Sequence, residues 1–147
     1  MEPKICFILG VSQRSGTNFL YRVLSLHPHC AGPGPIWEDC FLYHSEALVA
    51  FAEGMYKQWD SSWEVEEKLG RSSLLMRYLG GAIERFLRLQ LSPRGEEMTQ
   101  SQVQSDLNQV NVLLTKTPTA VGLPHFWDLF PDAKLILLVR DGRAVVE

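Results

Sequence analysis

The feature that most constrains the fold of this chain is a buried strand, a glycine-bounded polar loop and a helix, which follow one another near its N-terminus. Residues 5–9 (ICFIL) form a short, continuously apolar run, which is typical of a central strand in a parallel sheet. Residues 10–16 are polar, and from Thr17 the apolar side chains follow helical spacing as far as His27-Pro28. The sequence therefore predicts a strand, a turn and a helix in direct succession.

Strands and helices continue to alternate along the rest of the chain. The apolar runs at residues 110–114 and 134–139 are predicted as further buried strands. Residues 38–56 are predicted as a helix, and residues 63–91 as one long helix or two shorter ones, interrupted at Gly80-Gly81. This alternation predicts an α/β fold, a three-layer parallel sheet with at least three strands.

The remaining segments are predicted as connections and shorter helices. Residues 29–35 (HCAGPGP) are rich in helix and strand breakers and are expected to be loop, and residues 92–108 are expected to be a polar surface connection. A turn at residues 115–118 leads into a helix that starts near Pro118, and another helix starts at Arg143. We expect one domain over residues 1–147, truncated because the chain stops inside that last helix, with residues 38–110 as a helical insertion.

Composition narrows the classes of function. A net charge of −3 gives no bulk attraction to nucleic acid or to anionic lipid. Three cysteines without metal-type spacing are expected to be reduced thiols of a cytoplasmic protein. Since no apolar run reaches the ~18–20 residues of a membrane span, we expect no membrane segment. Any anion site must therefore be a local cluster of Arg, Lys and backbone N–H groups.

The loop at residues 10–18 (GVSQRSGTN) has the features of a phosphate site. A glycine-bounded turn that opens a helix presents several N–H groups together, and Arg14 adds a full positive charge. The alternative is an ordinary turn, capped by Ser15 or Thr17. The loop is not a Walker A motif, because Thr17 follows Gly16 directly with no lysine between them, and this disfavours ATP or GTP hydrolysis.

Four segments in order resemble the PAPS-dependent sulfotransferases, whose donor is 3′-phosphoadenosine 5′-phosphosulfate. Residues 13–20 (QRSGTNFL) resemble the 5′-phosphosulfate loop, and residues 135–145 (LILLVRDGRAV) resemble the 3′-phosphate motif. Two shorter segments resemble motifs of the tyrosylprotein branch: residues 116–118 (KTP) resemble Lys-Asp-Pro, and residues 130–134 (FPDAK) resemble Phe-Pro-Asn-Ala-Lys. The motif sequences of this chain are most similar to those of the tyrosylprotein and bacterial branches of the family. The resemblance implies the P-loop-like sulfotransferase fold and a full domain roughly twice this length.

The chain departs from the family pattern at three motif positions. Gln13 replaces a proline, Asn18 replaces a threonine whose role its side-chain amide can share, and Thr117 replaces an aspartate.

The resemblance implies transfer of a sulfuryl group from PAPS to an acceptor hydroxyl, on a protein tyrosine, a carbohydrate or a small molecule. No metal is required. The expected partners are this nucleotide co-substrate and the acceptor, with a homodimer left open and neither nucleic acid nor membrane involved. The expected nucleotide ligands are Arg14, Ser15, Gly16, Thr17, Asn18 and Arg140.

Three residues are predicted to act on the transferring group. Arg14 is expected to stabilise the leaving phosphate, and by resemblance Lys116 contacts the group in transfer. Glu38 is the predicted base, although a carboxylate that only stabilises a helix start is an equal alternative. Asp39 is the second choice of base, and three histidines are further alternatives: His27, His29 and His44.

Two other functional interpretations remain open. A P-loop nucleotide kinase or NTPase would require the missing lysine, and a non-catalytic fragment would keep the fold with weak nucleotide binding or none. Five large aromatic side chains are expected to pack mainly in the core rather than to line an acceptor pocket: Trp37, Trp59, Trp63, Phe126 and Trp127.

Overall fold

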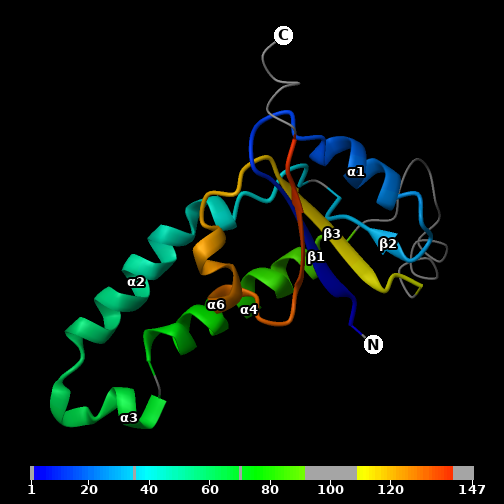
Figure 1. The fold of residues 1–147 in the computed structure, drawn as a ribbon. Helices are drawn as coiled ribbons and strands as arrows, with labels where there is room; N and C mark the ends of the chain where they lie inside the picture. Colours follow the sequence, from blue (N-terminus) through cyan, green and yellow to red (C-terminus); the bar gives the residue numbers. More distant parts are fainter. Residues whose placement is uncertain (1, 35, 70, 92–108, 141–147) are drawn as a thin grey trace.

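The computed structural model describes residues 2–34, 36–69, 71–91 and 109–140, and it contains a sheet of four parallel strands (Figure 1). The strands lie in the order β2-β3-β1-β4. They are β1 (Lys4–Gly10), β2 (Cys30–Ala31), β3 (Val112–Thr117) and β4 (Lys134–Leu138). The strands predicted around residues 5–9, 110–114 and 134–139 are therefore all present, and the α/β prediction is confirmed.

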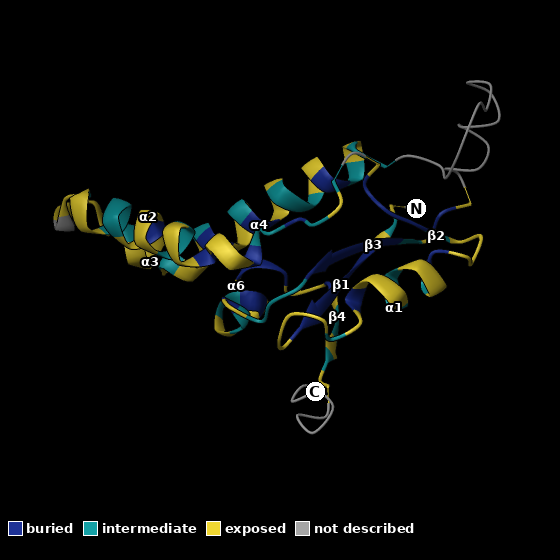
Figure 2. Cartoon of the chain, turned by 90° about the horizontal axis from the view of Figure 1, so that it is seen from above, coloured by how far each residue is buried: buried dark blue, intermediate teal, exposed yellow. Residues whose placement is uncertain are grey.

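Helices cover both faces of the sheet, which makes three layers (Figure 2). Helix α1 (Thr17–Leu24) lies on one face, and α4 (Ser72–Leu89) and α6 (Phe126–Leu129) lie on the other. The main core lies between the sheet and the α4 side, where side chains from alternate positions of β1 pack with helix residues. The largest of these side chains are fully buried: Ile5, Phe7, Leu9, Leu87, Leu113, Phe126, Leu129 and Phe130.

Helices α2 (Ser45–Gln58) and α4 form a pair that extends beyond the sheet (Figure 1). The 3-10 turn Ser61–Trp63 and the short α3 (Val65–Leu69) connect them at the far end. The segment predicted as one long helix or two is thus two helices, and α4 passes through Gly80 and Gly81 without a break. No helix in the described ranges is both long and apolar enough to cross a membrane.

Several predicted boundaries were wrong because contacts between distant segments override the local pattern. The helix predicted from residue 38 begins only at Ser45, after the 3-10 turn Leu42–His44, since residues 38–41 lie across the end of β3. The predicted loop at 29–35 contains β2, which pairs Cys30 with Val112.

The prediction for the segment after the second apolar run also needs correction. Strand β3 continues to Thr117, so Lys116 lies inside the strand rather than in a turn. The helix expected at Pro118 is replaced by the 3-10 turn Leu123–His125 and the four-residue α6. The connection predicted at 92–108 and the helix start predicted at Arg143 lie outside the described residues.

Candidate functional site

The loop between β1 and α1 has the backbone of an anion cradle. Two of its residues lie in the left-handed region, Arg14 at φ 63° and Gly16 at φ 96°. A non-glycine residue held at positive φ is unusual, and such strain gathers at binding and catalytic loops. Gly16 is the N-cap of α1 and offers no side-chain cap. The hydroxyl of Ser15 turns back to the backbone of Ser12, whose N–H donates to Ser15 Oγ at 3.1 Å.

This geometry contradicts the alternative interpretation, in which the loop is an ordinary turn with Ser15 as the helix cap. The helix start carries no side-chain cap, so its first N–H groups are presented to whatever lies beyond the loop. Together with the partial positive charge of a helix N-terminus, they form an arrangement that suits a phosphate.

Arg140 comes from the far end of β4 to the same loop. The register pairs Gly10 with Leu138, and the N–H of Val11 donates to the carbonyl of Leu138 at 3.0 Å. Arg140 Nη1 donates to the backbone oxygen of Arg14 at 3.3 Å. Two predicted phosphate ligands, which lie far apart in sequence, thus meet at the carboxyl ends of neighbouring parallel strands, where α/β proteins bind ligands.

Lys116 is a buried cation at the same end of the sheet. It pairs in register with Ile8, just before β1 enters the loop, and its side chain is completely buried. Its Nζ lies 3.1 Å from Glu38 Oε1, and the Glu38 side chain is 35% exposed. The structure therefore brings together Lys116 and Glu38, the two predicted catalytic residues that precede and follow the helical segment.

Trp37 connects this ion pair to α1. Lys116 Nζ lies 4.3 Å from the centroid of the Trp37 ring, at a distance that allows a cation–π contact. The guanidinium of Arg22 in α1 lies 5.8 Å from the same centroid, and Tyr21 packs edge-on against the ring. The Lys116 side chain thus lies on the face of the sheet that α1 covers.

Asp39, the second choice of base, lies on the other face. Its Oδ2 accepts a hydrogen bond from Thr115 Oγ1 at 2.6 Å, and its Oδ1 accepts one from the N–H of Phe41 at 3.1 Å. Because side chains alternate along a strand, Thr115 and Lys116 point to opposite faces. Burial raises the pKa of Asp39, and the hydrogen bonds from Thr115, Phe41 and Thr117 oppose that rise. Its carboxylate therefore lies away from Lys116, in a structural contact.

The comparison with known families agrees with this geometry. A model described as the Sulfotransferase family matches residues 5–147. The chain belongs to the sulfotransferase family. This membership favours the interpretation from the four motifs over that of a P-loop kinase or NTPase.

Curated relatives of this sulfotransferase-family chain are consistent with that assignment. Protein-tyrosine sulfotransferase 1 of Danio rerio is 29% identical over 99% of the chain and 35% of its own length. A putative protein-tyrosine sulfotransferase of Caenorhabditis briggsae is 26% identical over 97% of the chain and 41% of its own length. Protein-tyrosine sulfotransferase 1 of Homo sapiens is 27% identical over 99% of the chain and 33% of its own length. The chain thus spans between a third and about two fifths of these relatives.

The three histidines considered as alternative bases lie away from the ion pair of the sulfotransferase-family site. The carbonyl of His29 accepts hydrogen bonds from the N–H groups of Asn111 and Val112, at the opposite end of β3 from Lys116. The rings of His27 and His29 pack in a tilted arrangement, with 5.3 Å between their centroids. His44 is exposed next to Tyr43, just before α2. None of these three side chains contacts the Lys116–Glu38 pair.

The expectation that the large aromatic side chains fill the core is wrong for most of them. Phe126 is fully buried and Trp59 is half-buried, but three tryptophans expose more than half of their surface: Trp37, Trp63 and Trp127. Trp37 was missed as a site residue because nothing in the local pattern indicates that its ring lies beside Lys116.

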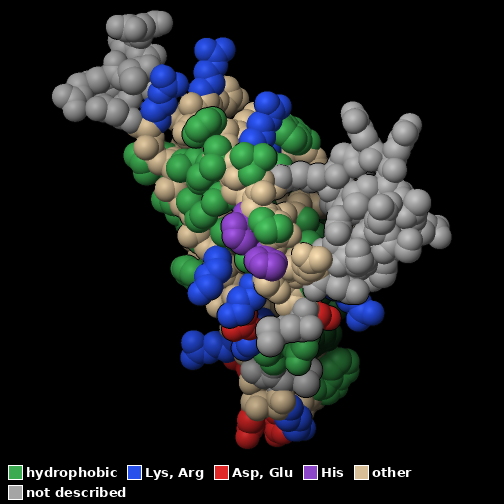
Figure 3. Space-filling view, turned by 90° about the vertical axis from the view of Figure 1, so that its right-hand side faces the viewer, with side chains coloured by type: hydrophobic (Ala, Val, Ile, Leu, Met, Phe, Trp, Pro, Cys, Tyr) green, Lys and Arg blue, Asp and Glu red, His purple; other side chains and the backbone are tan. Residues whose placement is uncertain are grey.

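The outer face of α1 also exposes apolar side chains. Phe19 and Val23 of α1 are 73% and 44% exposed, and Leu26, just beyond the end of the helix, is 79% exposed, although their spacing predicted an apolar stripe along one side of the helix. Figure 3 shows hydrophobic side chains gathered on this side of the molecule, with Lys and Arg at its upper edge and histidines below. The half-buried Leu20 and Leu24 face inward instead.

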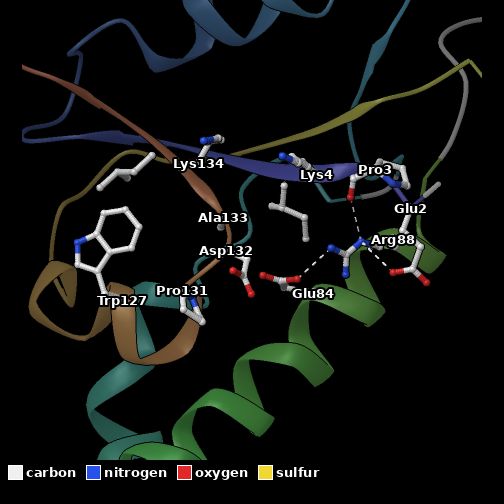
Figure 4. Close-up of a pocket in the computed structure, with 12 residues that line it drawn as sticks. Glu2, Pro3, Lys4, Glu84, Arg88, Trp127, Pro131, Asp132, Ala133 and Lys134 are labelled. Carbon is white, nitrogen blue, oxygen red and sulfur yellow. Dashed lines mark hydrogen bonds and ion pairs between the residues drawn. The ribbon is translucent and has the colours of Figure 1, made fainter.

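A separate hollow of about 660 Å³ lies at the amino ends of β1 and β4, away from the loop at 10–18 (Figure 4). Its charged lining residues on the α4 side of the sheet are Arg88, Glu2, Glu84 and Asp132, whereas the amines of Lys4 and Lys134 point to the other side. Arg88 is engaged there, since it donates to the carbonyl of Pro3 at 3.1 Å and to Glu84 at 3.0 Å. This excess of carboxylates does not favour an anionic nucleotide in the hollow, so the candidate site remains at the opposite end of the sheet.

Proposed function

We propose that this chain forms the nucleotide-binding part of a sulfotransferase that moves a sulfuryl group from PAPS to an acceptor hydroxyl. The observation that carries the proposal is the ion pair between Lys116 and Glu38, 3.1 Å long, at the sheet end that also holds the phosphate-type loop. A buried cation next to a partly exposed carboxylate provides both a charge stabiliser and a proton acceptor.

The loop residues fit the phosphate groups of the donor. The N–H groups at the start of α1, with the side chains of Ser15, Thr17 and Asn18, would bind the 5′-phosphate oxygens. Arg14 would face the bridging oxygen, where negative charge grows as the S–O bond breaks. Arg140, which lies against the backbone of Arg14, would bind the 3′-phosphate.

The ion pair would act on the acceptor and on the transferring group. When the acceptor oxygen forms its new bond to sulfur, Glu38 would take the hydroxyl proton, and Lys116 with Arg14 would stabilise the departing phosphate. The nucleotide product is adenosine 3′,5′-bisphosphate. Sulfuryl transfer resembles phosphoryl transfer in needing in-line positioning and charge stabilisation, and these residues can supply both.

The acceptor is proposed from the relatives alone. Their names specify protein tyrosine, so a tyrosine peptide is the first acceptor to test, with carbohydrate and small-molecule hydroxyls as further arms. A cytoplasmic location, a homodimer and the role of residues 38–110 as an insertion stay predictions.

Thermal unfolding with ligands tests the nucleotide site. Adenosine 3′,5′-bisphosphate should raise Tm, since a ligand that binds only the folded state must stabilise it. Arg14→Ala should weaken that rise, whereas the control Arg77→Ala should keep it, because Arg77 is exposed and pairs with Asp132 near the other end of the sheet. ATP with Mg²⁺ should have little effect.

The alternatives give distinct results in this experiment. A Tm rise with ATP–Mg²⁺ that exceeds the rise with the bisphosphate would support a P-loop nucleotide enzyme. No rise with either ligand would reject the proposed site in this chain. Bisphosphate binding without transfer to any acceptor would support a non-catalytic fragment.

A further inference from the structure

We propose that Asp39 is a positioning residue, which fixes residues 37–41 across the end of β3 and thereby holds Glu38 against Lys116. The catalytic meaning of this role rests on the proposed function, but the positioning itself can be tested without it.

Residues 38 and 39 reach opposite faces of the same strand end. Glu38 meets Lys116 on the α1 face, whereas Asp39 meets Thr115 on the α4 face. Thr115 and Lys116 are consecutive in β3, so their side chains point to opposite sides of the sheet. The segment therefore crosses β3 with one acidic side chain on each side, and the position of one carboxylate determines the position of the other.

Four hydrogen bonds fix this crossing. The N–H of Asp39 donates to the carbonyl of Lys116 at 3.2 Å, and the N–H of Cys40 donates to Thr117 Oγ1 at 3.3 Å. The Asp39 carboxylate accepts from Thr115 and from the N–H of Phe41. Cys40 between them takes a positive φ of 53°, which turns the chain toward the 3-10 turn Leu42–His44.

The carboxylate has a property that a neutral isostere lacks. Asp39 accepts hydrogen bonds on both of its oxygens, from Thr115 on Oδ2 and from Phe41 on Oδ1. An asparagine can still accept from the N–H of Phe41, but its contact with Thr115 must then reverse, with the amide NH₂ donating to the hydroxyl oxygen, and a bond to a carboxylate is replaced by a weaker neutral one. Asp39 is 8% exposed, and a carboxylate is costly to bury unless its hydrogen bonds are made. These hydrogen bonds therefore hold the carboxyl group where it orders the crossing of β3.

The reactivity of Lys116 measures this positioning directly. Its amine is fully buried under the Glu38 contact, whereas the side chains of Lys57 and Lys68 are 76% and 63% exposed. Acylation by an amine-reactive ester, followed by peptide mass spectrometry, gives the rate at Lys116 relative to these two internal standards. Alkylation of the buried thiol of Cys6 in β1 reports global unfolding in the same samples.

Matched variants separate the hydroxyl and the charge from general perturbation. Thr115→Val removes the hydroxyl with little change in shape, and Thr115→Ser keeps it. Asp39→Asn removes one acceptor. Asp60→Asn is the control, because Asp60 also accepts a backbone N–H, from Ser62, but is exposed and lies near α3.

We expect Lys116 to react about tenfold faster or more in Thr115→Val and Asp39→Asn, the change expected when a hydrogen bond to a charged group is lost. Thr115→Ser and Asp60→Asn should keep the wild-type rate, and Cys6 should stay protected in all four variants. An unchanged Lys116 rate in Thr115→Val and Asp39→Asn would overturn the proposal. So would a parallel rise at Cys6, since Asp39 would then support the whole fold rather than the position of Glu38.

The nucleotide experiment distinguishes this proposal from the proposed function. The loop at 10–18 is untouched in Thr115→Val, so the Tm rise with the bisphosphate should be retained. If the wild type shows no such rise, the proposed function fails while the Lys116 rates still decide the role of Asp39. Where transfer is measurable, Thr115→Val should lower kcat and leave KM for the donor nucleotide unchanged, and a change in that KM alone would contradict the positioning role.

Discussion

Two adjacent glycines in α4 should respond in opposite directions to the same substitution. A Cβ added at Gly80 would lie 1.8 Å from the carbonyl oxygen of Leu129 and 2.5 Å from its carbon, whereas a Cβ at Gly81 meets nothing within 4 Å. Gly80 is therefore a point of close approach between α4 and α6, and Gly81 faces open space. We expect Gly80→Ala to destabilise the protein and Gly81→Ala to stabilise it.

The magnitudes follow from the contact distances. Ordinary contact begins near 3.4 Å, so in Gly80→Ala the two helices must separate by roughly 1.5 Å. Leu129 cannot yield freely, because it is buried and its neighbours Phe126 and Phe130 pack against Phe7. Overpacking typically costs about 1–3 kcal/mol. Alanine has a helix propensity roughly 1 kcal/mol better than glycine at either position. At Gly80 this gain offsets part of the overpacking cost, whereas at Gly81 no such cost opposes it.

Thermal unfolding followed by far-UV circular dichroism measures both effects. The 1.8 Å approach to a backbone oxygen places Gly80→Ala at the upper end of the overpacking range, so the net loss is about 2 kcal/mol. Gly80→Ala should then lower Tm by roughly 4–8 °C, and Gly81→Ala should raise it by roughly 2–4 °C. If both variants raise Tm, the approach of α4 to α6 is looser than the structure has it, and the reasoning fails. If both lower Tm alike, the glycines serve the flexibility of α4 rather than a close contact.

Three further outcomes are expected. Gly16→Ala forces a side chain to φ 96°, so we expect a loss of roughly 1–2 kcal/mol in the free energy of unfolding, and calorimetric titration should show little remaining affinity for the bisphosphate. Glu38→Ala removes the carboxylate from the fully buried Lys116 amine and should lower the free energy of unfolding in urea by about 3 kcal/mol. Lys116→Met leaves only a partly exposed carboxylate without its ion pair and should cost less than half of that. Equal losses would contradict the assigned burial. The pKa of Asp39 is raised in the folded state, so between its unfolded and folded pKa values the native state binds more protons, and stability falls as pH rises through that range. Thr115→Val removes a hydrogen bond that lowers the pKa of Asp39, so this pKa should rise further in the variant. The Tm difference between variant and wild type should therefore be larger at neutral pH than near the pKa of Asp39 in the unfolded state. A difference that grows on acidification would refute this.

The strands and the phosphate-type loop could be predicted from the sequence because their signals are local. Residues 5–9 are apolar at every position, as a strand covered on both faces must be, and a glycine-bounded turn follows them. Residues 135–139 are also continuously apolar, although β4 proves to be only partly buried rather than the buried strand that was predicted. The helix boundaries were less predictable. Gly80-Gly81 was interpreted as an interruption because glycine disfavours helices, whereas Gly80 is there to admit the backbone of Leu129.

The parts of the site that depend on distant pairing could not be derived from spacing. Glu38 and Lys116 each came from a resemblance to a motif, but their contact depends on the chain crossing β3, which no local pattern indicates. Asp39 was interpreted as an alternative base because an acidic residue next to Glu38 looks equivalent to it in sequence. The two carboxylates are assigned to different faces because Thr115 and Lys116 alternate in β3. The sequence predicted that this strand ends at residue 114, so it gave no sign of the alternation.

The order of strands in the sheet has a consequence for how the chain reaches this structure. The central strand β1 precedes both of its partners in the chain, since it pairs with β3 and β4, which begin at Val112 and Lys134. During synthesis on the ribosome, the apolar segment of β1 therefore has neither of these strands to pair with while α2, α3 and α4 emerge and can form. Such non-local pairing slows folding and prolongs exposure to aggregation. We therefore expect slow refolding in one late step, with helical signal appearing before the sheet, and a dependence on chaperones that a helical protein of this size would not share.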